Sequence, residues 1–385
     1  DPHTCRFHLR SPPPRAPGRL LVVRAPTPYR LSRLVEQFIV SRDDEIYEAF
    51  PDVALTPTGR LVCVFAECTH HRDRSYTRVM MTRSDDRGRT WSEKVPISEA
   101  LKGDPKQNPW WNCPRVSCLS DGRLVVVCDR IAGWGEGMFG EQSNWLWISD
   151  DGGETWTGPR STPIVGIVPD QLIELKAGEH AGRWLLSAQT KLPPKETPLW
   201  SVRTWLSDDG GQTWSQPCRI AEVLGLQLCE GSVAELPDGD LVCFMRENSG
   251  QGLDAFKCLS SDGGESWQGP FRFPLPGCHR PVAGMLNDEL MLITHRYMQG
   301  GKGWVGWWTQ NFFAGLTDVE SCRARRREDA HTRILPVDFD RHLESDTGYS
   351  GWVQFDDGEI YIVNYILDDA PKAQIRGYSL RMKDF

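Results

Sequence analysis

Ionisable or hydroxyl-bearing side chains recur at matching positions in six similar segments of the chain. In chain order the first position holds Asp52, Arg115, Asp170, Glu230, Arg280 and Tyr349, and the second position holds Glu67, Arg130, Arg246 and Arg296 in four segments. Burying such groups costs free energy unless they pair with one another or bind a ligand. The set is therefore either a network of ion pairs or the lining of a ligand site, and both interpretations stay open.

The six segments share one pattern, two apolar strands joined by a tight turn that contains Asp or Gly. They span residues 50–67, 113–130, 168–190, 229–247, 279–297 and 348–366. Repetition of one supersecondary unit predicts an array in which the units pack side by side around an axis. If the array closes into a propeller, the first strand of each unit lines the axis. The polar residues above would then converge on one mouth.

A second repeat follows the first four of these segments. The pattern S-x-D-x-G-x-[TS]-W occurs at residues 84–91, 149–156, 207–214 and 260–267, at spacings of 65, 58 and 53 residues. Asp and Gly supply the geometry of a hairpin turn, and the tryptophan is expected to pack back onto the sheet. The repeat therefore predicts a structural turn in each of four units.

This turn motif resembles the Asp-box of the sialidase (neuraminidase) superfamily, whose members contain BNR repeats. The resemblance implies an all-β fold, a six-bladed β-propeller of four-stranded antiparallel sheets, formed by residues 19–385 as a single catalytic domain. Residues 1–18 are rich in Pro and Arg and are expected to form an extended or disordered arm. One of the apolar runs 20–23 and 38–40 is expected to supply the outer strand that closes the ring.

The resemblance also implies three catalytic residues. Tyr349, in DTGYS, resembles the nucleophile, and Glu230, in CEGSV, resembles the glutamate that accepts its proton. Asp73, eleven residues before the first box, resembles the acid/base aspartate, and His70 and His71 are rival proton donors. A neutral tyrosine suits a sugar with a carboxylate on its anomeric carbon, because an anionic nucleophile would be repelled. The implied activity is that of a retaining exo-glycoside hydrolase.

Three arginines bind the substrate carboxylate in this superfamily, since guanidinium matches a carboxylate in bidentate geometry. Arg246 resembles the second of them, and either Arg280 or Arg296 resembles the third. Ala49 stands where the first is expected, so the chain resembles a divergent member. The candidates for a replacement are Arg42 and Arg115.

The expected partner is a sialylated or other acidic glycan that ends in a sialic acid or a related 2-keto-3-deoxy sugar acid. Two alternatives remain: a non-catalytic propeller that binds carbohydrate or protein, and a glycosidase or lyase of the superfamily with non-sialic specificity. Further candidates for substrate binding are Asp52, Asp170, Arg115, His70, His71 and Trp111. The tryptophans expected in loops, which either stack on sugars or pack against a blade, are Trp110, Trp111, Trp134, Trp304, Trp307 and Trp308.

Composition excludes other classes of partner. With a net charge of −8 and a pI near 5.7, the chain lacks the basic excess that neutralises nucleic-acid phosphates. No run approaches the ~18 consecutive apolar residues of a membrane span, so we expect no membrane association. Several of the 12 cysteines lie in predicted strands, which favours small buried hydrophobes in a cytoplasmic protein. A secreted protein is the alternative, because a cleaved signal peptide leaves no trace.

No cofactor and no catalytic metal are expected. The pairs Cys63/Cys68 and Cys113/Cys118 lack the spacing of a zinc site, and no glycine-rich phosphate loop precedes a helix. The sequence pattern does not indicate whether a structural Ca²⁺ is bound or which oligomeric state the protein adopts.

Overall fold

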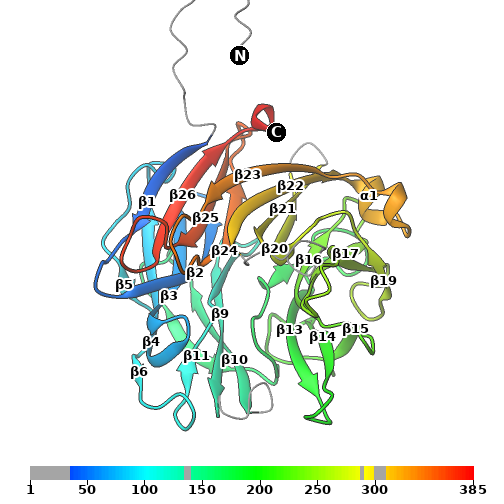
Figure 1. Cartoon of the computed structure of the whole chain (residues 1–385), viewed down its shortest axis with the longest axis horizontal. Helices are drawn as coiled ribbons and strands as arrows, with labels where there is room; N and C mark the ends of the chain where they lie inside the picture. Colours follow the sequence, from blue (N-terminus) through cyan, green and yellow to red (C-terminus); the bar gives the residue numbers. More distant parts are fainter. Residues whose placement is uncertain (1–34, 134–139, 287–289, 299–308) are drawn as a thin grey trace, which may run out of the picture. The chain divides into compact units, whose positions relative to one another are not determined.

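The computed structural model describes residues 35–133, 140–286, 290–298 and 309–385. The predicted arm at residues 1–18 lies outside the described residues, as do residues 19–34. The described chain forms six antiparallel sheets arranged as a β-propeller, so the predicted fold class is confirmed (Figure 1). Inner strands of neighbouring sheets contact one another, as β2 (Tyr47–Leu55) contacts β24 (Thr347–Gln354). No described helix is long and apolar enough to cross a membrane.

The first three blades follow the chain in order. The first contains β2, β3 (Leu61–His70), β4 (Asp73–Ser84) and β5 (Val95–Pro96), with β6 (Leu101–Lys102) also on β4. The second contains β8 (Arg115–Cys118), β9 (Leu124–Ala132), β10 (Glu141–Ser149) and β11 (Thr157–Ser161), with β7 (Trp110–Trp111) also on β9. The third contains β12 (Ile173–Glu174), β13 (Trp184–Leu192), β14 (Leu199–Ser207) and β15 (Cys218–Glu222).

The last three blades repeat this arrangement, and each predicted hairpin forms the inner pair of one blade. The fourth contains β16 (Leu228–Glu235), β17 (Leu241–Glu247), β18 (Phe256–Ser260) and β19 (Gln268–Arg272). The fifth contains β20 (Cys278–Met285), β21 (Leu290–Tyr297), β22 (Asn311–Asp318) and β23 (Arg333–Phe339). The sixth contains β24, β25 (Ile360–Ile366), β26 (Gln374–Leu380) and β1 (Glu36–Ser41).

The ring is closed by β1, which lies beside β26 in Figure 1 and pairs with it antiparallel. Of the two apolar runs proposed for this role, residues 38–40 therefore form the closing strand. Because the outer strand of the sixth blade comes from the other end of the chain, no turn joins it to the third strand. This connectivity explains why the sixth blade has no Asp-box.

Each Asp-box forms the turn between the third and fourth strands of its blade. In the first box, Ser84 Oγ donates to Asp86 at 2.8 Å, and Asp86 accepts from the amide and hydroxyl of Thr90 at 2.8 and 2.6 Å. The Trp91 ring packs against the core. In the fifth blade, the helix α1 (Val319–Arg323) and a 3-10 turn at Arg327–Asp329 occupy the equivalent connection, which accounts for the missing fifth box.

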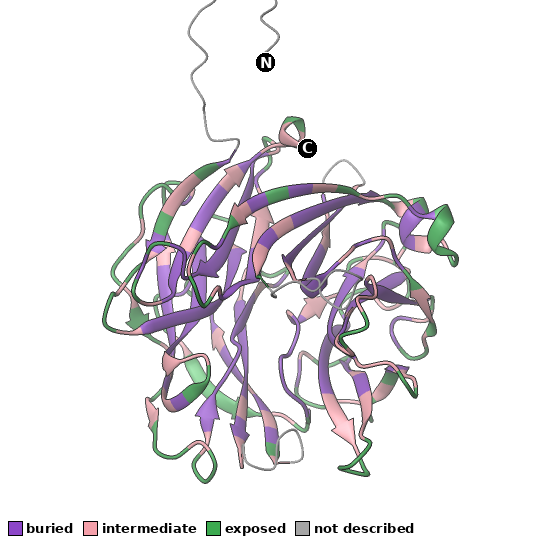
Figure 2. Cartoon of the chain, in the orientation of Figure 1, coloured by how far each residue is buried: buried purple, intermediate pink, exposed green. Residues whose placement is uncertain are grey.

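The core consists of apolar side chains between neighbouring blades, while the outer strands and turns are exposed (Figure 2). Between the first two blades, for example, Val62 and Val64 pack with Val126 and Trp111. All cysteines in the described ranges are unpaired, and most of them are buried in this core, as expected of small apolar side chains.

Inner strands of several blades share a local irregularity where they approach the axis. The register shifts by a residue near Phe50, Glu230, Arg280 and Gly348, and these residues have φ values of 58°, 50°, 49° and 100°. A left-handed conformation costs a residue with a Cβ about 1 to 2 kcal/mol. A bulge of this kind bends the strand and redirects a side chain, so these sites are candidates for function.

Candidate active site

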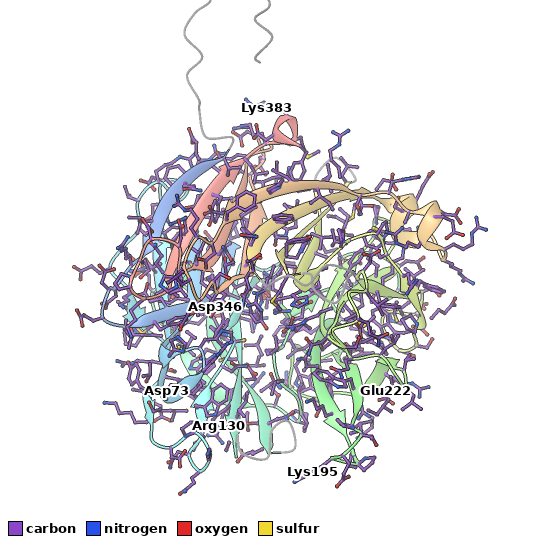
Figure 3. The ribbon with its side chains drawn as sticks, in the orientation of Figure 1. Asp73, Arg130, Lys195, Glu222, Asp346 and Lys383 are labelled. Atoms are coloured by element: carbon purple, nitrogen blue, oxygen red, sulfur yellow. The ribbon has the colours of Figure 1, made fainter. Side chains whose placement is uncertain are left out.

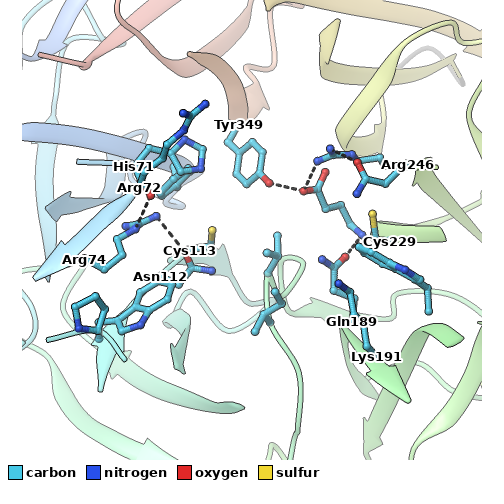
Figure 4. Close-up of a pocket in the computed structure, with 18 residues that line it drawn as sticks. His71, Arg72, Arg74, Asn112, Cys113, Gln189, Lys191, Cys229, Arg246 and Tyr349 are labelled. Atoms are coloured by element: carbon cyan, nitrogen blue, oxygen red, sulfur yellow. Dashed lines mark hydrogen bonds and ion pairs between the residues drawn. The ribbon is translucent and has the colours of Figure 1, made fainter. Parts of the chain in front are cut away.

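One cavity of about 640 Å³ is lined by five of the six blades, a volume typical of small-ligand sites (Figure 4). Cations outnumber anions on its wall, where Arg72, Arg74, Lys191 and Arg246 face a single carboxylate, Glu230. The other lining residues are Phe50, His71, Pro105, Trp110, Asn112, Cys113, Ile167, Val168, Gln189, Trp200, Cys229, Asn248 and Tyr349.

Tyr349 and Glu230 meet at the wall of this cavity. The Tyr349 hydroxyl donates to Oε1 of Glu230, which also accepts from Nη1 of Arg246 at 2.9 Å. The second oxygen, Oε2, accepts from the backbone amide of Arg280 at 2.9 Å. Glu230 reaches Tyr349 because its left-handed backbone lies at the bulge of β16, and Gly348 plays the equivalent part in β24. A phenol and a carboxylate so arranged can exchange a proton.

Electrostatics keep this proton on the phenol in the resting protein. Burial favours the neutral carboxyl, but the Arg246 charge and the hydrogen bond from Tyr349 outweigh it and lower the pKa of Glu230 to about 2. Burial and the Glu230 charge raise the pKa of Tyr349 well above its ordinary value. The Tyr349 oxygen can therefore act as a nucleophile only if its proton moves to Glu230 while the new bond forms.

Two other predicted arginines, Arg296 and Arg42, bond to other side chains of the protein and do not line the cavity. Nη2 of Arg296 donates to the Tyr365 hydroxyl at 2.8 Å, and its guanidinium lies 4.9 Å from the centroid of the Tyr349 ring. Arg296 therefore packs against the ring of Tyr349 and does not line the cavity. Of the predicted carboxylate-binding arginines, Arg246 alone lines it. Arg42 pairs with Asp44 at 2.8 Å on the surface and does not replace the first one.

Four predicted substrate-binding residues form a buried network outside the cavity lining. Nε of Arg115 lies 3.3 Å from Asp52, and Nη1 of Arg280 lies 3.9 Å from Asp170. Arg280 also donates to the Pro169 carbonyl at 2.8 Å. For these four residues, the contacts agree with the first of the two interpretations of the repeated polar positions, a network of ion pairs. The structure does not bring the four residues to the cavity.

Asp73 is not among the residues that line the cavity with Tyr349 and Glu230. Its exposed carboxylate accepts from the Ser75 amide at 2.9 Å, which lowers its pKa, and it does not line the cavity. Figure 3 labels Asp73 near the start of β4 in the first blade, whereas the label of Asp346 lies nearer the middle of the picture. His70 lies in a second cavity of about 490 Å³ and not in the first. Residues 73 and 74 alternate along β4, so Arg74, not Asp73, lines the cavity.

His71 lines the cavity and pairs with a buried aspartate. Its Nδ1 lies 2.5 Å from Oδ2 of Asp346, which also accepts from the Tyr47 hydroxyl at 2.5 Å. Oδ1 of Asp346 accepts from Tyr365 at 2.7 Å and lies 3.6 Å from Arg296. Burial would raise the pKa of Asp346, but His71 and Arg296 outweigh it and hold that pKa well below its ordinary value.

Aromatic side chains complete the wall, although not all of those predicted. Trp110 lines the cavity, 5.1 Å from the Arg74 guanidinium, whereas Trp111 packs in the core against Trp147. Sequence analysis did not find Trp200, whose ring centroid lies 4.4 Å from the Lys191 ammonium group. The predicted loop tryptophans outside the described residues are Trp134, Trp304, Trp307 and Trp308.

The described residues contain no group of three or more His, Cys, Asp or Glu side chains that could hold a metal ion. The absence of a catalytic metal or cofactor stays a prediction. What the cavity offers is a phenol beside a carboxylate, an imidazole beside a second carboxylate, and four cationic side chains.

Comparison with known proteins places these features in context. Residues 59–296 match the model of the BNR repeat-like domain family. A sialidase of Micromonospora viridifaciens is 28% identical over 237 residues, which cover 56% of this chain and 35% of that protein. The match therefore spans about a third of the length of this relative.

Two solved structures share the fold. A protein of unknown function from Dyadobacter fermentans has a TM-score of 0.72 and 22% identity, over 91% of this chain and 98% of that one. A leech intramolecular trans-sialidase, solved with 2,7-anhydro-Neu5Ac, has a TM-score of 0.67 and 13% identity, over 89% and 69% of the two chains. At these identities the likeness concerns the propeller fold alone.

Proposed function

Because this chain belongs to the BNR repeat-like family of the sialidase superfamily, we propose that it is a retaining exo-glycoside hydrolase that releases a terminal acidic sugar. The observation that carries the proposal is the hydrogen bond from the Tyr349 hydroxyl to Glu230 at the wall of a cationic cavity. A binding module has no need of a phenol paired with an ionised carboxylate. A hydrolase uses that pair to make a nucleophile.

In the first step the Tyr349 oxygen bonds to the anomeric carbon, its proton passes to Glu230, and the bond to the leaving oxygen breaks as an acid group at the cavity protonates that oxygen. In the second step water attacks the same carbon and gives a proton back to that group, while Tyr349 leaves and regains its proton from Glu230. Two inversions give net retention of configuration. Arg296, 4.9 Å from the Tyr349 ring, stabilises negative charge as it develops on the phenol oxygen.

The cavity charge supports an acidic sugar as the substrate. Arg246 and Lys191 lie on strands of the fourth and third blades, and Arg72 and Arg74 lie on the opposite wall in Figure 4. Cationic side chains on both walls attract an anion and hold its carboxylate near the reacting carbon. We propose a sialic acid or a related 2-keto-3-deoxy sugar acid.

A second specificity within the same superfamily is supported by one observation. Ala49 replaces the first expected arginine, and Arg246 is the only predicted clamp arginine on the cavity wall. An incomplete clamp favours a glycoside whose acid group lies elsewhere on the ring or is absent.

The test is a panel of aryl glycosides of sialic, deaminated sialic, uronic and arabinosyl types, each incubated with the protein and with Tyr349→Phe. We expect release of one acidic sugar by the parent and a loss of at least about 100-fold in kcat for the variant. Tyr76→Phe is the matched control, since Tyr76 also donates to a glutamate, Glu67, at 2.7 Å, but lies outside the cavity lining. Absence of release from every glycoside would leave a non-catalytic carbohydrate-binding propeller as the function.

A further inference from the structure

The Tyr349–Glu230 pair supplies a nucleophile and its base, but glycoside cleavage also needs a group that protonates the leaving oxygen. Asp73 does not reach the cavity, and the hydrogen bond from Ser75 favours its ionised form, which has no proton to give. Among the described residues that line the cavity, Glu230 is the only carboxylate and His71 the only histidine. Glu230 already accepts the hydrogen bond of the Tyr349 hydroxyl and, in the proposed reaction, its proton.

The hydrogen-bond partners of His71 fix which of its nitrogens can meet a substrate. Asp346 is held in its ionised form, so it can only accept, and the hydrogen between it and His71 belongs to Nδ1. This leaves Nε2 as the nitrogen available to a ligand. The His71 side chain is 36% exposed, whereas that of Asp346 is 10% exposed. The pair therefore has one buried end and one end open to solvent.

The two pairs lie on adjoining parts of the cavity wall. The rings of His71 and Tyr349 both contact the Phe50 ring, each with a centroid separation of 5.1 Å. Figure 4 shows the two side chains next to each other, with Arg246 beyond Tyr349. The pairs are also linked electrostatically, because Arg296 lies 3.6 Å from Asp346 and 4.9 Å from the Tyr349 ring centroid. A sugar bound with its anomeric carbon at the Tyr349 oxygen and its leaving group directed toward Phe50 would have that leaving group beside His71.

We propose, on the basis of the hydrolase function above, that His71 is the acid/base residue of this protein and that Asp346 positions it. In the first step the bond from the anomeric carbon to the leaving oxygen breaks, and the proton on Nε2 of His71 passes to that oxygen. In the second step Nε2 takes a proton from the attacking water. Asp346 accepts from Nδ1 throughout, which holds the ring in one orientation and compensates its charge.

The test compares two glycosides of the acidic sugar that the parent protein releases in the panel test, one with a dinitrophenyl and one with an alkyl leaving group. Dinitrophenolate departs without protonation and an alcohol does not, so only the alkyl glycoside needs the acid. We expect His71→Ala and His71→Gln to lose about 100-fold or more of kcat/KM on the alkyl glycoside and far less on the dinitrophenyl glycoside, because kcat/KM reports the first step, whereas the second step is common to both substrates. Added imidazole should restore part of the alkyl activity of His71→Ala. Retained cleavage of the dinitrophenyl substrate shows that each variant is folded.

Two controls separate this inference from rival explanations. His70→Gln removes the neighbouring imidazole, which lies outside the main cavity, and should leave both activities unchanged. Asp73→Asn should also leave both unchanged. The inference is overturned if Asp73→Asn shows the leaving-group dependence, or if the His71 variants lose both activities equally or neither. A parent protein that cleaves neither glycoside contradicts the hydrolase function itself, which is a distinguishable result.

Discussion

Glu230 is the residue on which the proposed chemistry of the cavity depends, because it is buried and yet ionised. The residue is 4% exposed, and burial alone would favour the protonated form of its carboxyl group. Arg246 is the largest contribution that opposes burial, through a contact of 2.9 Å. Arg246 thus lines the cavity and also keeps the Glu230 carboxylate free of its proton.

Replacing Arg246 with Gln should therefore change the pH dependence of activity. Without the guanidinium, burial dominates and the pKa of Glu230 rises from about 2. The ionised base is then lost at a higher pH, so the acid limb of kcat/KM should shift upward by about 1 to 3 pH units. Arg203→Gln is the control, because Arg203 pairs with Glu222 at 2.9 Å outside the cavity lining. A uniform loss of activity at every pH would restrict Arg246 to substrate binding.

Tyr349 and Glu230 occupy the same position in two of the six repeated segments, and this position predicted that they would converge at the axis. The structure brings the two side chains into contact. Their roles stay predictions until activity is measured. The acid/base position was harder to predict, because three neighbouring residues, His70, His71 and Asp73, can all transfer protons. His71 differs from the other two because it lines the cavity and pairs with Asp346, 275 residues away, and a single sequence shows neither feature.

At the scale of elements, bulges of the inner strands bring Tyr349 and Glu230 together at the cavity wall. Gly348 has a φ of 100°, and a Cβ added there would lie 2.4 Å from the Cβ and 2.6 Å from the Cα of Arg296. The second of these is a backbone atom, so no side-chain rotation relieves the contact. The position therefore requires glycine both for its conformation and for its space.

Gly348→Ala should consequently destabilise the protein and displace Tyr349. The matched control is Gly358→Ala, in the turn between β24 and β25, where φ is 81° and nothing lies within 4 Å of the added Cβ. Gly358→Ala should cost only the left-handed strain, about 1 to 2 kcal/mol. Gly348→Ala should cost about 1 to 3 kcal/mol more and also abolish aryl glycoside cleavage. Urea unfolding and kcat measure the two effects, and equal costs would contradict the close contact with Arg296.

Strand alternation and turn residues sufficed to predict all six inner hairpins. The bulges could not be predicted in the same way, because Phe50, Val168, Glu230 and Arg280 adopt positive φ although none is glycine. Their strain is imposed by the packing of neighbouring blades around the axis, a tertiary effect that overrides local preference. The small additional strands β6 and β7 were not predicted either, since each has only two residues.

At the scale of the whole propeller, stability and the site depend on closure of the sixth blade. This blade contains β24, which carries Tyr349, and its outer strand β1 comes from the opposite end of the described chain. Val40 of β1 is buried, and Phe38 packs 6.2 Å from Tyr361. The sequence predicted that one of the runs 20–23 and 38–40 closes the ring, because an open propeller leaves an exposed sheet edge, but it did not distinguish between them.

Removal of β1 should therefore loosen the blade that contains Tyr349, the proposed nucleophile. We compare a chain that begins at Val35, where the compact unit starts, with one that begins at Arg42. The shorter chain leaves the edge of β26 unpaired and should melt at a temperature lower by roughly 5 °C or more, with reduced kcat. A synthetic peptide of residues 35–41 should restore both properties, because it can pair with β26 along the same register. A peptide in which Phe38 and Val40 are replaced by Ser should not, since it lacks the side chains that pack inward. Equal melting temperatures for the two chains would show that the ring is held closed by its inner strands alone.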